Sequence, residues 1–180
     1  MSDRPTTPET IIAAHGPIHR FLSGEHARLD RLLEAARELA SPAGVEAYAQ
    51  FRRALLRHIS MEEKVLLPDA EKRRGAPHPL AARLRLEHGA MAALMMPSAS
   101  RAILHTLRTI LERHNPLEES PGGVYDACEQ LAGADAARLL SAIEATPEVP
   151  VKPHLDTEKT RTAVGHALER AGYDPHLLDE

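Results

Sequence analysis

A histidine and a glutamate stand four positions apart at His58 and Glu62, inside a segment whose apolar residues repeat at intervals of three and four. An α-helix has about 3.6 residues per turn, so residues four apart share a face. Phe51, Leu55 and Leu66 belong to the same face, and the pair is therefore predicted to be buried. Because an unpaired buried carboxylate is costly, the pair needs either a compensating charge or a metal ion.

The same spacing returns at His114 and Glu118, and single histidines occupy the apolar faces of two further predicted helices. Four imidazoles and two carboxylates suit two metal ions, because each carboxylate can bridge a pair of ions in a helical core. Mixed nitrogen and oxygen donors favour iron, with manganese or zinc as alternatives. The predicted metal ligands are His26, His58, Glu62, His88, His114 and Glu118.

The fourth helix offers His105 as an alternative to His114, because the lengths of the connecting segments would place His105 nearer the level of His88. His105 shares its face with Arg108 and Glu112, whereas His114 continues the leucine face. Periodicity therefore favours His114. Taken singly, a buried histidine is more often a hydrogen-bonded core residue than a ligand, so the prediction rests on the six residues together.

His15 and His19 also lie on the apolar face of the first helix, but His19 is two turns, about 10 Å, from His26. We interpret both as polar core residues or as supports for the ligands, with completion of the site by one of them as the alternative. Glu63 and Glu119 are interpreted as solvated residues or as hydrogen-bond partners of ligand histidines. Tyr48 and Tyr125 are expected to pack in the core, with lining of an access path as the alternative.

Apolar spacing and helix-breaking residues predict four long helices that position these side chains. Their expected ranges are residues 8–40, 44–74, 81–97 and 98–119, with Ser98 or Ser100 beginning the fourth and Pro116 distorting its end. Pro17 either kinks the first helix or marks its start. Two short amphipathic pieces, 124–131 and 134–145, a proline-containing linker and a peripheral helix over 157–171 complete the chain.

The predicted fold class is all-α, an antiparallel up-down-up-down four-helix bundle with additional short C-terminal helices. We expect a polar lead-in over residues 1–10, the bundle over 11–146, and the linker with its helix over 147–180.

Composition excludes several classes of function. The 180 residues contain 22 basic and 26 acidic side chains, which gives no electrostatic case for nucleic acid binding. No apolar run approaches the roughly 20 residues that span a bilayer, and residues 1–10 lack the apolar region of a signal peptide, so we expect no membrane partner and a cytoplasmic protein. A single cysteine, Cys128, provides neither a disulfide framework nor a thiolate metal site.

Two H-x-x-x-E motifs alternating with two single histidines resemble the hemerythrin-like (HHE) cation-binding domain, over roughly residues 11–130. The segments that carry the resemblance are 24–30, the stretch around His58, 86–88 and 114–119. The resemblance implies a four-helix bundle with two non-haem irons joined by carboxylate and oxo or hydroxo bridges. It also implies binding of, or reaction with, dioxygen, nitric oxide or peroxide. By position, the four histidines would be terminal ligands, and Glu62 and Glu118 would be the bridges.

The sequence departs from the oxygen carriers of that family, which have a further histidine four residues from the third-helix ligand. Leu84 and Ala92 occupy the corresponding positions here. Because the ligand set is nearly symmetric and has one histidine fewer, we expect redox reaction, sensing or labile iron, and not reversible oxygen carriage.

Two hypotheses follow. The first is a di-iron protein that binds, reduces or oxidises a small diatomic molecule or peroxide at the metal, with a redox partner. It is expected to be a metal- and small-ligand-binding protein more than an enzyme that turns over a substrate. The second is a regulatory or interaction module without turnover, in which metal occupancy or oxidation state alters the C-terminal linker and helix. A ferritin-like oxidase is disfavoured, because its E-x-x-H pairs are absent from the apolar faces.

Overall fold

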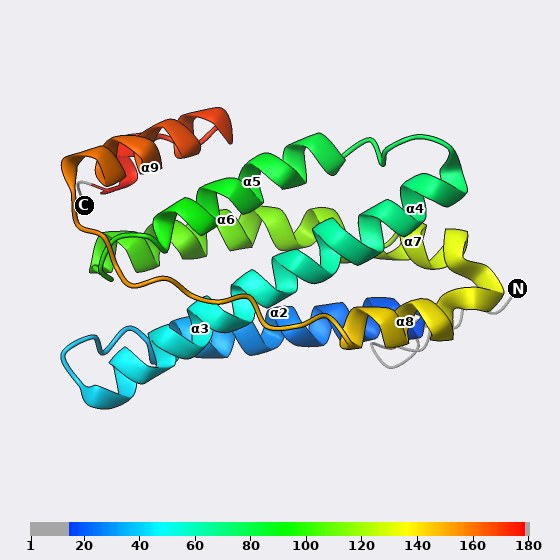
Figure 1. Cartoon of the computed structure of the whole chain (residues 1–180), viewed down its shortest axis with the longest axis horizontal. Helices are drawn as coiled ribbons and strands as arrows, with labels where there is room; N and C mark the ends of the chain where they lie inside the picture. The colour runs from blue at the N-terminus through cyan, green and yellow to red at the C-terminus, as the bar shows by residue number, and fades with distance from the viewer. Residues whose placement is uncertain (1–14, 179–180) are drawn as a thin grey trace, which may run out of the picture.

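The computed structural model describes residues 15–178, and all regular secondary structure in that range is helical. The expectation of an all-α protein is confirmed. The long segments are α2 (Pro17–Ala35), α3 (Pro42–Met61) continued by η1 (Glu62–Leu66) and α4 (Leu67–Arg74), α5 (Ala81–Leu94) and α6 (Arg101–Glu119) (Figure 1). The shorter elements are α7 (Val124–Ala132), η2 (Gly133–Asp135), α8 (Ala136–Glu144), α9 (Glu158–Arg170) and η3 (Pro175–Leu178).

Side chains at the helix ends explain several of these boundaries. The Ser41, Ser100 and Thr157 side chains accept hydrogen bonds from the backbone N–H groups three residues later, at 3.0, 3.2 and 3.1 Å. Gly75 ends α4 in the left-handed region with φ of 78°. Pro17 is the first residue of α2 and so marks the start of that helix, whereas the predicted start near residues 8–10 lies outside the described residues.

The first helix ends earlier than predicted, at Ala35 instead of Ala40. Residues 36–41 form the connection to α3, with the N–H of Arg37 bonded to Glu34 O at 3.1 Å and the N–H of Ser41 bonded to Glu38 O at 2.8 Å. These residues have good helix propensity, but α2 and α3 pack against each other and the chain must reverse within a few residues. Packing therefore overrides local preference here.

The second predicted helix is continuous to Arg74 but contains one wide π-helical turn, Glu62–Leu66. Pro68 follows that turn, and in a regular α-helix its ring would collide with the carbonyl of Lys64, to which it also cannot donate. The wide turn occurs just before this position, and Leu67 N bonds to Glu62 O. π-Turns inside α-helices are frequent at functional sites, and this one begins at a predicted ligand. By contrast, α6 continues through Pro116.

The buried apolar residues form two separate clusters along the long helices. One cluster contains Leu33, Phe51, Met91 and Leu107, and the other contains Leu22, Met61, Leu84 and Tyr125. On α2, α3 and α5 the chain passes from one cluster to the other across His26, His58 and His88. The histidines thus share a polar layer between two apolar clusters.

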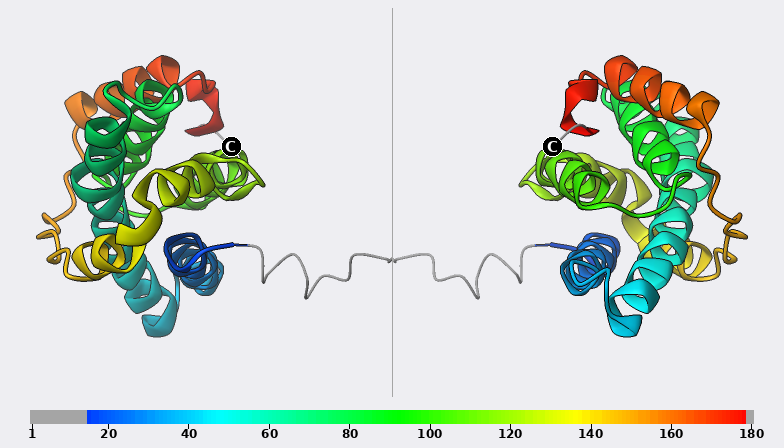
Figure 2. Two further views of the ribbon diagram at one scale, coloured as in Figure 1. Left: turned by 90° about the vertical axis from the view of Figure 1, so that its right-hand side faces the viewer. Right: turned by 90° about the vertical axis from the view of Figure 1, so that its left-hand side faces the viewer.

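The last helix is not peripheral, contrary to the prediction. α9 packs against α5, as both views in Figure 2 show, and places Val164 and Leu168 in the first apolar cluster. The linker before it is extended and is held by Arg52, whose Nη2 donates to Lys152 O at 2.9 Å, and by the N–H of Leu155, which donates to Met96 O at 2.9 Å. Sequence periodicity revealed that α9 has an apolar face but could not reveal what covers it.

Each helix within residues 15–178 is too short or too polar to traverse a lipid bilayer.

Candidate metal centre

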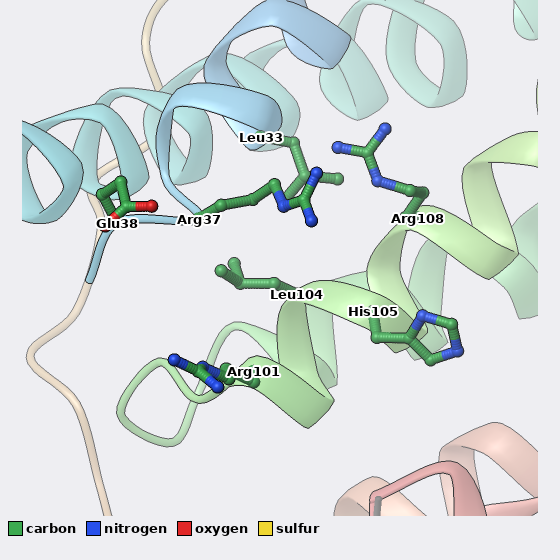
Figure 3. Close-up of a pocket in the computed structure, with 7 residues that line it drawn as sticks. All are labelled: Leu33, Arg37, Glu38, Arg101, Leu104, His105 and Arg108. Atoms are coloured by element: carbon green, nitrogen blue, oxygen red, sulfur yellow. The ribbon is translucent and has the colours of Figure 1, made fainter. Parts of the chain in front are cut away.

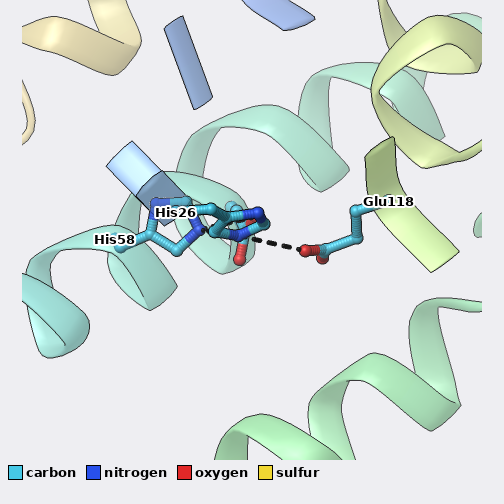
Figure 4. A group of neighbouring side chains, drawn as sticks. His26, His58 and Glu118 are labelled. Atoms are coloured by element: carbon cyan, nitrogen blue, oxygen red, sulfur yellow. Dashed lines mark hydrogen bonds and ion pairs between the residues drawn. The ribbon is translucent and has the colours of Figure 1, made fainter. Parts of the chain in front are cut away.

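The structure brings all six predicted ligands into one buried layer, with each of the six at most 3% exposed. The histidines project from four different helices, α2, α3, α5 and α6, and the glutamates follow one turn after the histidines of α3 and α6. In Figure 4, His26 and His58 meet from neighbouring helices and Glu118 points toward them from α6. Residues far apart in sequence thus converge because each lies at the boundary between the two apolar clusters.

The donors divide into two overlapping groups, within each of which the ligating atoms lie within 4.8 Å of one another. One group contains His26 and His58, the other contains His88 and His114, and both share the two glutamates. The Nε2 atoms of His26 and His58 are 2.8 Å apart, and those of His88 and His114 are 3.1 Å apart. Each imidazole pair therefore directs its two nitrogens toward a common point.

The two glutamates connect the groups. Glu62 Oε1 lies 3.2 Å from His58 Nε2, while its Oε2 lies 3.2 Å from His88 Nε2. Glu118 Oε2 lies 3.5 Å from His26 Nε2 and 3.2 Å from His114 Nε2. Each carboxylate thus faces one imidazole from each of the two pairs. A carboxylate that bridges two ions needs this placement.

The donor geometry fits metal ions better than it fits hydrogen bonds alone. Two nitrogens bound to one ion at about 2.1 Å and about 90° apart would be separated by about 3.0 Å, close to both observed imidazole separations. Apart from its 3.2 Å approach to His88 Nε2, the buried Glu62 Oε2 has no hydrogen-bond donor among the described residues. A buried acceptor without a donor costs free energy, and a cation would satisfy it.

Outer carboxylates hold three of the four histidines with Nε2 directed inward, by accepting a hydrogen bond from Nδ1. The pairs are His26 with Glu119 at 2.5 Å, His88 with Glu63 at 3.0 Å, and His114 with Glu87 at 2.8 Å. Glu63 and Glu119 are therefore hydrogen-bond partners of predicted ligand histidines, which is one of their two expected roles. The role of Glu87 was missed, because a glutamate beside a histidine in a helix gives no sign of which neighbouring helix it faces.

The buried imidazoles and carboxylates shift one another's pKa values. Burial lowers the pKa of His88, but hydrogen bonds with Glu62 and Glu63 outweigh burial and raise it to about 9. For His114, burial is likewise outweighed by Glu118 and Glu87, and its pKa rises to about 10. Burial raises the pKa of Glu62, but the neighbouring His58 and His88 hold it well below its usual range. Imidazolium and carboxylate therefore pair when no cation is bound, so metal ions compete with protons.

Tyr125 is a further polar member of this layer, although helical periodicity predicts only that it packs in the core. Its hydroxyl donates to Glu62 Oε1 at 2.5 Å and lies 3.2 Å from Glu118 Oε2. The same oxygen lies 3.1 Å from His26 Nε2 and 3.4 Å from His58 Nε2. Burial and the nearby Glu118 and Glu62 carboxylates raise the pKa of this phenol well above its usual value. The site is therefore less symmetric than the sequence suggested, because Tyr125 lies on the His26–His58 side.

An open cleft of about 540 Å³ lies elsewhere, between the end of α2 and the start of α6 (Figure 3). Its lining residues are Leu33, Arg37, Glu38, Arg101, Leu104, His105 and Arg108. None of them belongs to the layer of predicted ligands, so this cleft does not open onto the candidate centre. His105, the rejected alternative in the fourth helix, lines this cleft.

A helical protein with a buried layer of histidines and glutamates in two overlapping groups belongs to the class of proteins whose side chains can hold metal ions within a helical core. The family model described as hemerythrin HHE cation binding domain matches residues 18–121. The chain therefore belongs to the hemerythrin HHE cation-binding family, and the resemblance found in the sequence is confirmed. Comparison with curated proteins and comparison with solved structures each gave no significant match.

Proposed function

We propose that this protein binds two iron ions in the buried layer and that dioxygen, nitric oxide or peroxide binds or reacts there. The observation that carries the proposal is the position of Glu62, whose two oxygens each lie 3.2 Å from an imidazole nitrogen of a different histidine pair. One carboxylate directed into both donor groups is typical of a bridged two-metal site. The six predicted ligands hold the ions in this proposal.

The proposal includes the antiparallel four-helix bundle, formed by α2, α3 with α4, α5 and α6. The course of the chain in Figure 1 supports it, because the colour runs in alternating directions along these four segments. Packing of α2 against α3 and of α5 against α6 supports it further. Short connections favour antiparallel neighbours.

Iron is the proposed metal because four imidazoles combined with carboxylate oxygens suit it, with manganese or zinc as alternatives. A bound iron pair would supply redox chemistry and coordination positions for a small ligand. Electrons would come from a redox partner. Leu84 is fully buried in an apolar cluster and supplies no further donor, which supports the expectation of reaction or sensing over reversible oxygen carriage.

The residues of the chain give the two halves of the site different roles in this proposal. The His26–His58 half has an additional oxygen donor in Tyr125, whose hydroxyl holds a proton against Glu62. We infer that the small ligand binds on the His88–His114 half, which has fewer protein donors. Glu63 and Glu87 orient the two imidazoles of that half.

Metal analysis of protein produced in iron-replete cells tests the proposal. The parent is expected to carry close to two irons per chain, and His58→Ala and Glu62→Ala should each lose a large part of that content. His166→Ala is the matched control, because His166 is exposed on α9 and should leave the content unchanged. Equal iron content in all four proteins would refute the assignment of the ligands.

The alternative is a regulatory module in which metal occupancy or oxidation state changes the C-terminal part of the chain. One contact supports this alternative, because α9 packs directly on α5, the helix that carries His88 and Glu87. The two functions are separable by experiment. Near-ultraviolet absorption that bleaches with reductant and returns in air supports the first, whereas protease sensitivity of residues 147–171 that follows metal occupancy without turnover supports the second.

A further inference from the structure

A second cluster of ligating side chains lies at the N-terminal end of α2. His15 and His19 stand one turn apart, and their imidazole rings stack with centroids 3.7 Å apart and planes inclined by 25°. Their Nδ1 atoms lie 3.0 and 2.7 Å from the same oxygen, Oδ1 of Asp126 in α7. One donor atom from each of the three residues lies within 4.8 Å of the others.

The charges of this cluster are compatible with a divalent cation. If both stacked imidazoles were protonated, two positive charges would face each other and Asp126 would neutralise only one of them. If both are neutral, Asp126 keeps its negative charge and each ring retains a nitrogen that can bind a metal. A single divalent ion among the three donors joins neutral rings to a charged oxygen without repulsion between the rings.

Asp126 is held in a position suited to this role. Its other oxygen, Oδ2, accepts a hydrogen bond from the N–H of Gly122 at 2.9 Å, which leaves Oδ1 directed at the two histidines. A ligand fixed by a hydrogen bond behind it is typical of metal sites.

The N-terminus of α2 carries a partial positive charge that would repel a cation, and the Glu129 carboxylate offsets this charge. This carboxylate accepts hydrogen bonds from the N–H groups of Ile18 and His19 at 3.3 and 2.9 Å, and so caps α2. Gly16 makes room for this cap, because a Cβ there would lie 2.1 Å from Glu129 Cδ. The helix end is thus neutralised by a carboxylate that is not needed as a ligand.

We propose that His15, His19 and Asp126 form a third metal-binding position, which takes one divalent transition-metal ion such as Zn²⁺ or Fe²⁺. Two imidazoles and one carboxylate are a donor set that such ions accept, with water completing the coordination. The side chains are 17%, 6% and 18% exposed, so the position is shielded but open to solvent on one side. Such an ion should exchange faster than ions in the buried layer.

The third position borders the candidate centre but shares no donor with it. The His19 ring meets the Tyr125 ring edge-on with centroids 5.8 Å apart, and the Tyr125 hydroxyl donates to Glu62. The proposal therefore stands independently of the two-iron assignment, and the experiment must measure the two sites separately.

Equilibrium titration of the chelator-treated full-length protein with Zn²⁺ tests the inference. The parent should bind one more equivalent than His15→Ala, or bind that equivalent at least tenfold more tightly. Asp126→Asn should behave like His15→Ala, since the amide oxygen still accepts from Gly122 but the charge is lost. His166→Ala should match the parent, and far-ultraviolet circular dichroism should show that each variant folds.

The same comparison in a His58→Ala background separates the two proposals. The difference of one equivalent between the parent and His15→Ala should persist there, because His58 belongs only to the buried layer. Identical Zn²⁺ stoichiometry and affinity with and without His15→Ala in both backgrounds would overturn the third position, whatever the buried layer binds. Crystals soaked in Zn²⁺ should show an anomalous peak between the three donors. The absence of a peak at this position would also overturn the proposal.

Discussion

Replacing Tyr125 by phenylalanine isolates the polar contact that only the folded structure revealed. The substitution removes one oxygen and keeps the ring, so packing in the second apolar cluster is preserved. In the metal-free protein, Glu62 Oε1 loses a donor at 2.5 Å. A hydrogen bond to a charged group contributes about 1.5–3 kcal/mol, and we expect the free energy of unfolding in urea to fall by that amount.

Tyr48→Phe is the matched control. Tyr48 is also buried, at 3% exposure, but its hydroxyl has no hydrogen-bond partner among the residues that the structure describes. Removing a buried hydroxyl without a partner should leave stability unchanged to within about 0.5 kcal/mol, or raise it. Equal losses in the two variants would refute the role given to the Tyr125 hydroxyl.

Metal retention gives a second measurement on the same pair of variants. Competition with a chromophoric chelator should show that Tyr125→Phe weakens the binding of one ion, since the hydroxyl lies 3.1 and 3.4 Å from the His26 and His58 nitrogens. Tyr48→Phe should release metal like the parent. If Tyr125→Phe weakened both ions equally, or neither, the asymmetry inferred for the two halves would be wrong.

Three further predictions follow from the site and the core. In metal-free protein, the raised pKa of His88, about 9, gives stability that is complete below about pH 6.5 and is lost as the pH rises through 9. Linkage sets the contribution of His88 to this loss at about 3 kcal/mol, and His114, with its pKa raised to about 10, adds a loss of the same sign. Urea unfolding between pH 6 and 10 should show the loss in metal-free but not in metal-loaded protein. Glu87→Gln should weaken metal binding about 10–100-fold in the same chelator competition, because His114 Nδ1 loses a charged hydrogen-bond acceptor. Unchanged metal affinity would count against the role of Glu87 in orienting His114. Leu168→Ala should lower the free energy of unfolding in urea by about 2–5 kcal/mol, because Leu168 is 0% exposed. Leu155→Ala is the control and should lower it by less than about 0.5 kcal/mol, because Leu155 is 50% exposed. Equal losses in the two variants would mean that α9 is not part of the core.

Helical periodicity and helix-end residues predict much of this architecture from the sequence. Helical periodicity separated His114 from His105, and the structure buries the first within the polar layer while the second lines a surface cleft. Residues that begin or end helices, such as Ser100 and Gly75, act through contacts with backbone only a few positions away. The spacing of His58 and Glu62 also needs only helix geometry, because it places both side chains on one face.

Tertiary structure alone decided which residues complete the polar layer. Tyr125 follows the break at Pro121 and Gly122, so helical spacing from Glu118 does not extend to it, and its contact with Glu62 joins residues 63 positions apart. His19 and Asp126 are 107 positions apart, and their meeting depends on how α7 turns back onto α2. The sequence of this protein thus determined which side chains share a helix face, because sharing a face depends only on the fixed period of the helix. Which faces meet depends on chain reversals and packing between distant segments, and that information appears only in the folded protein.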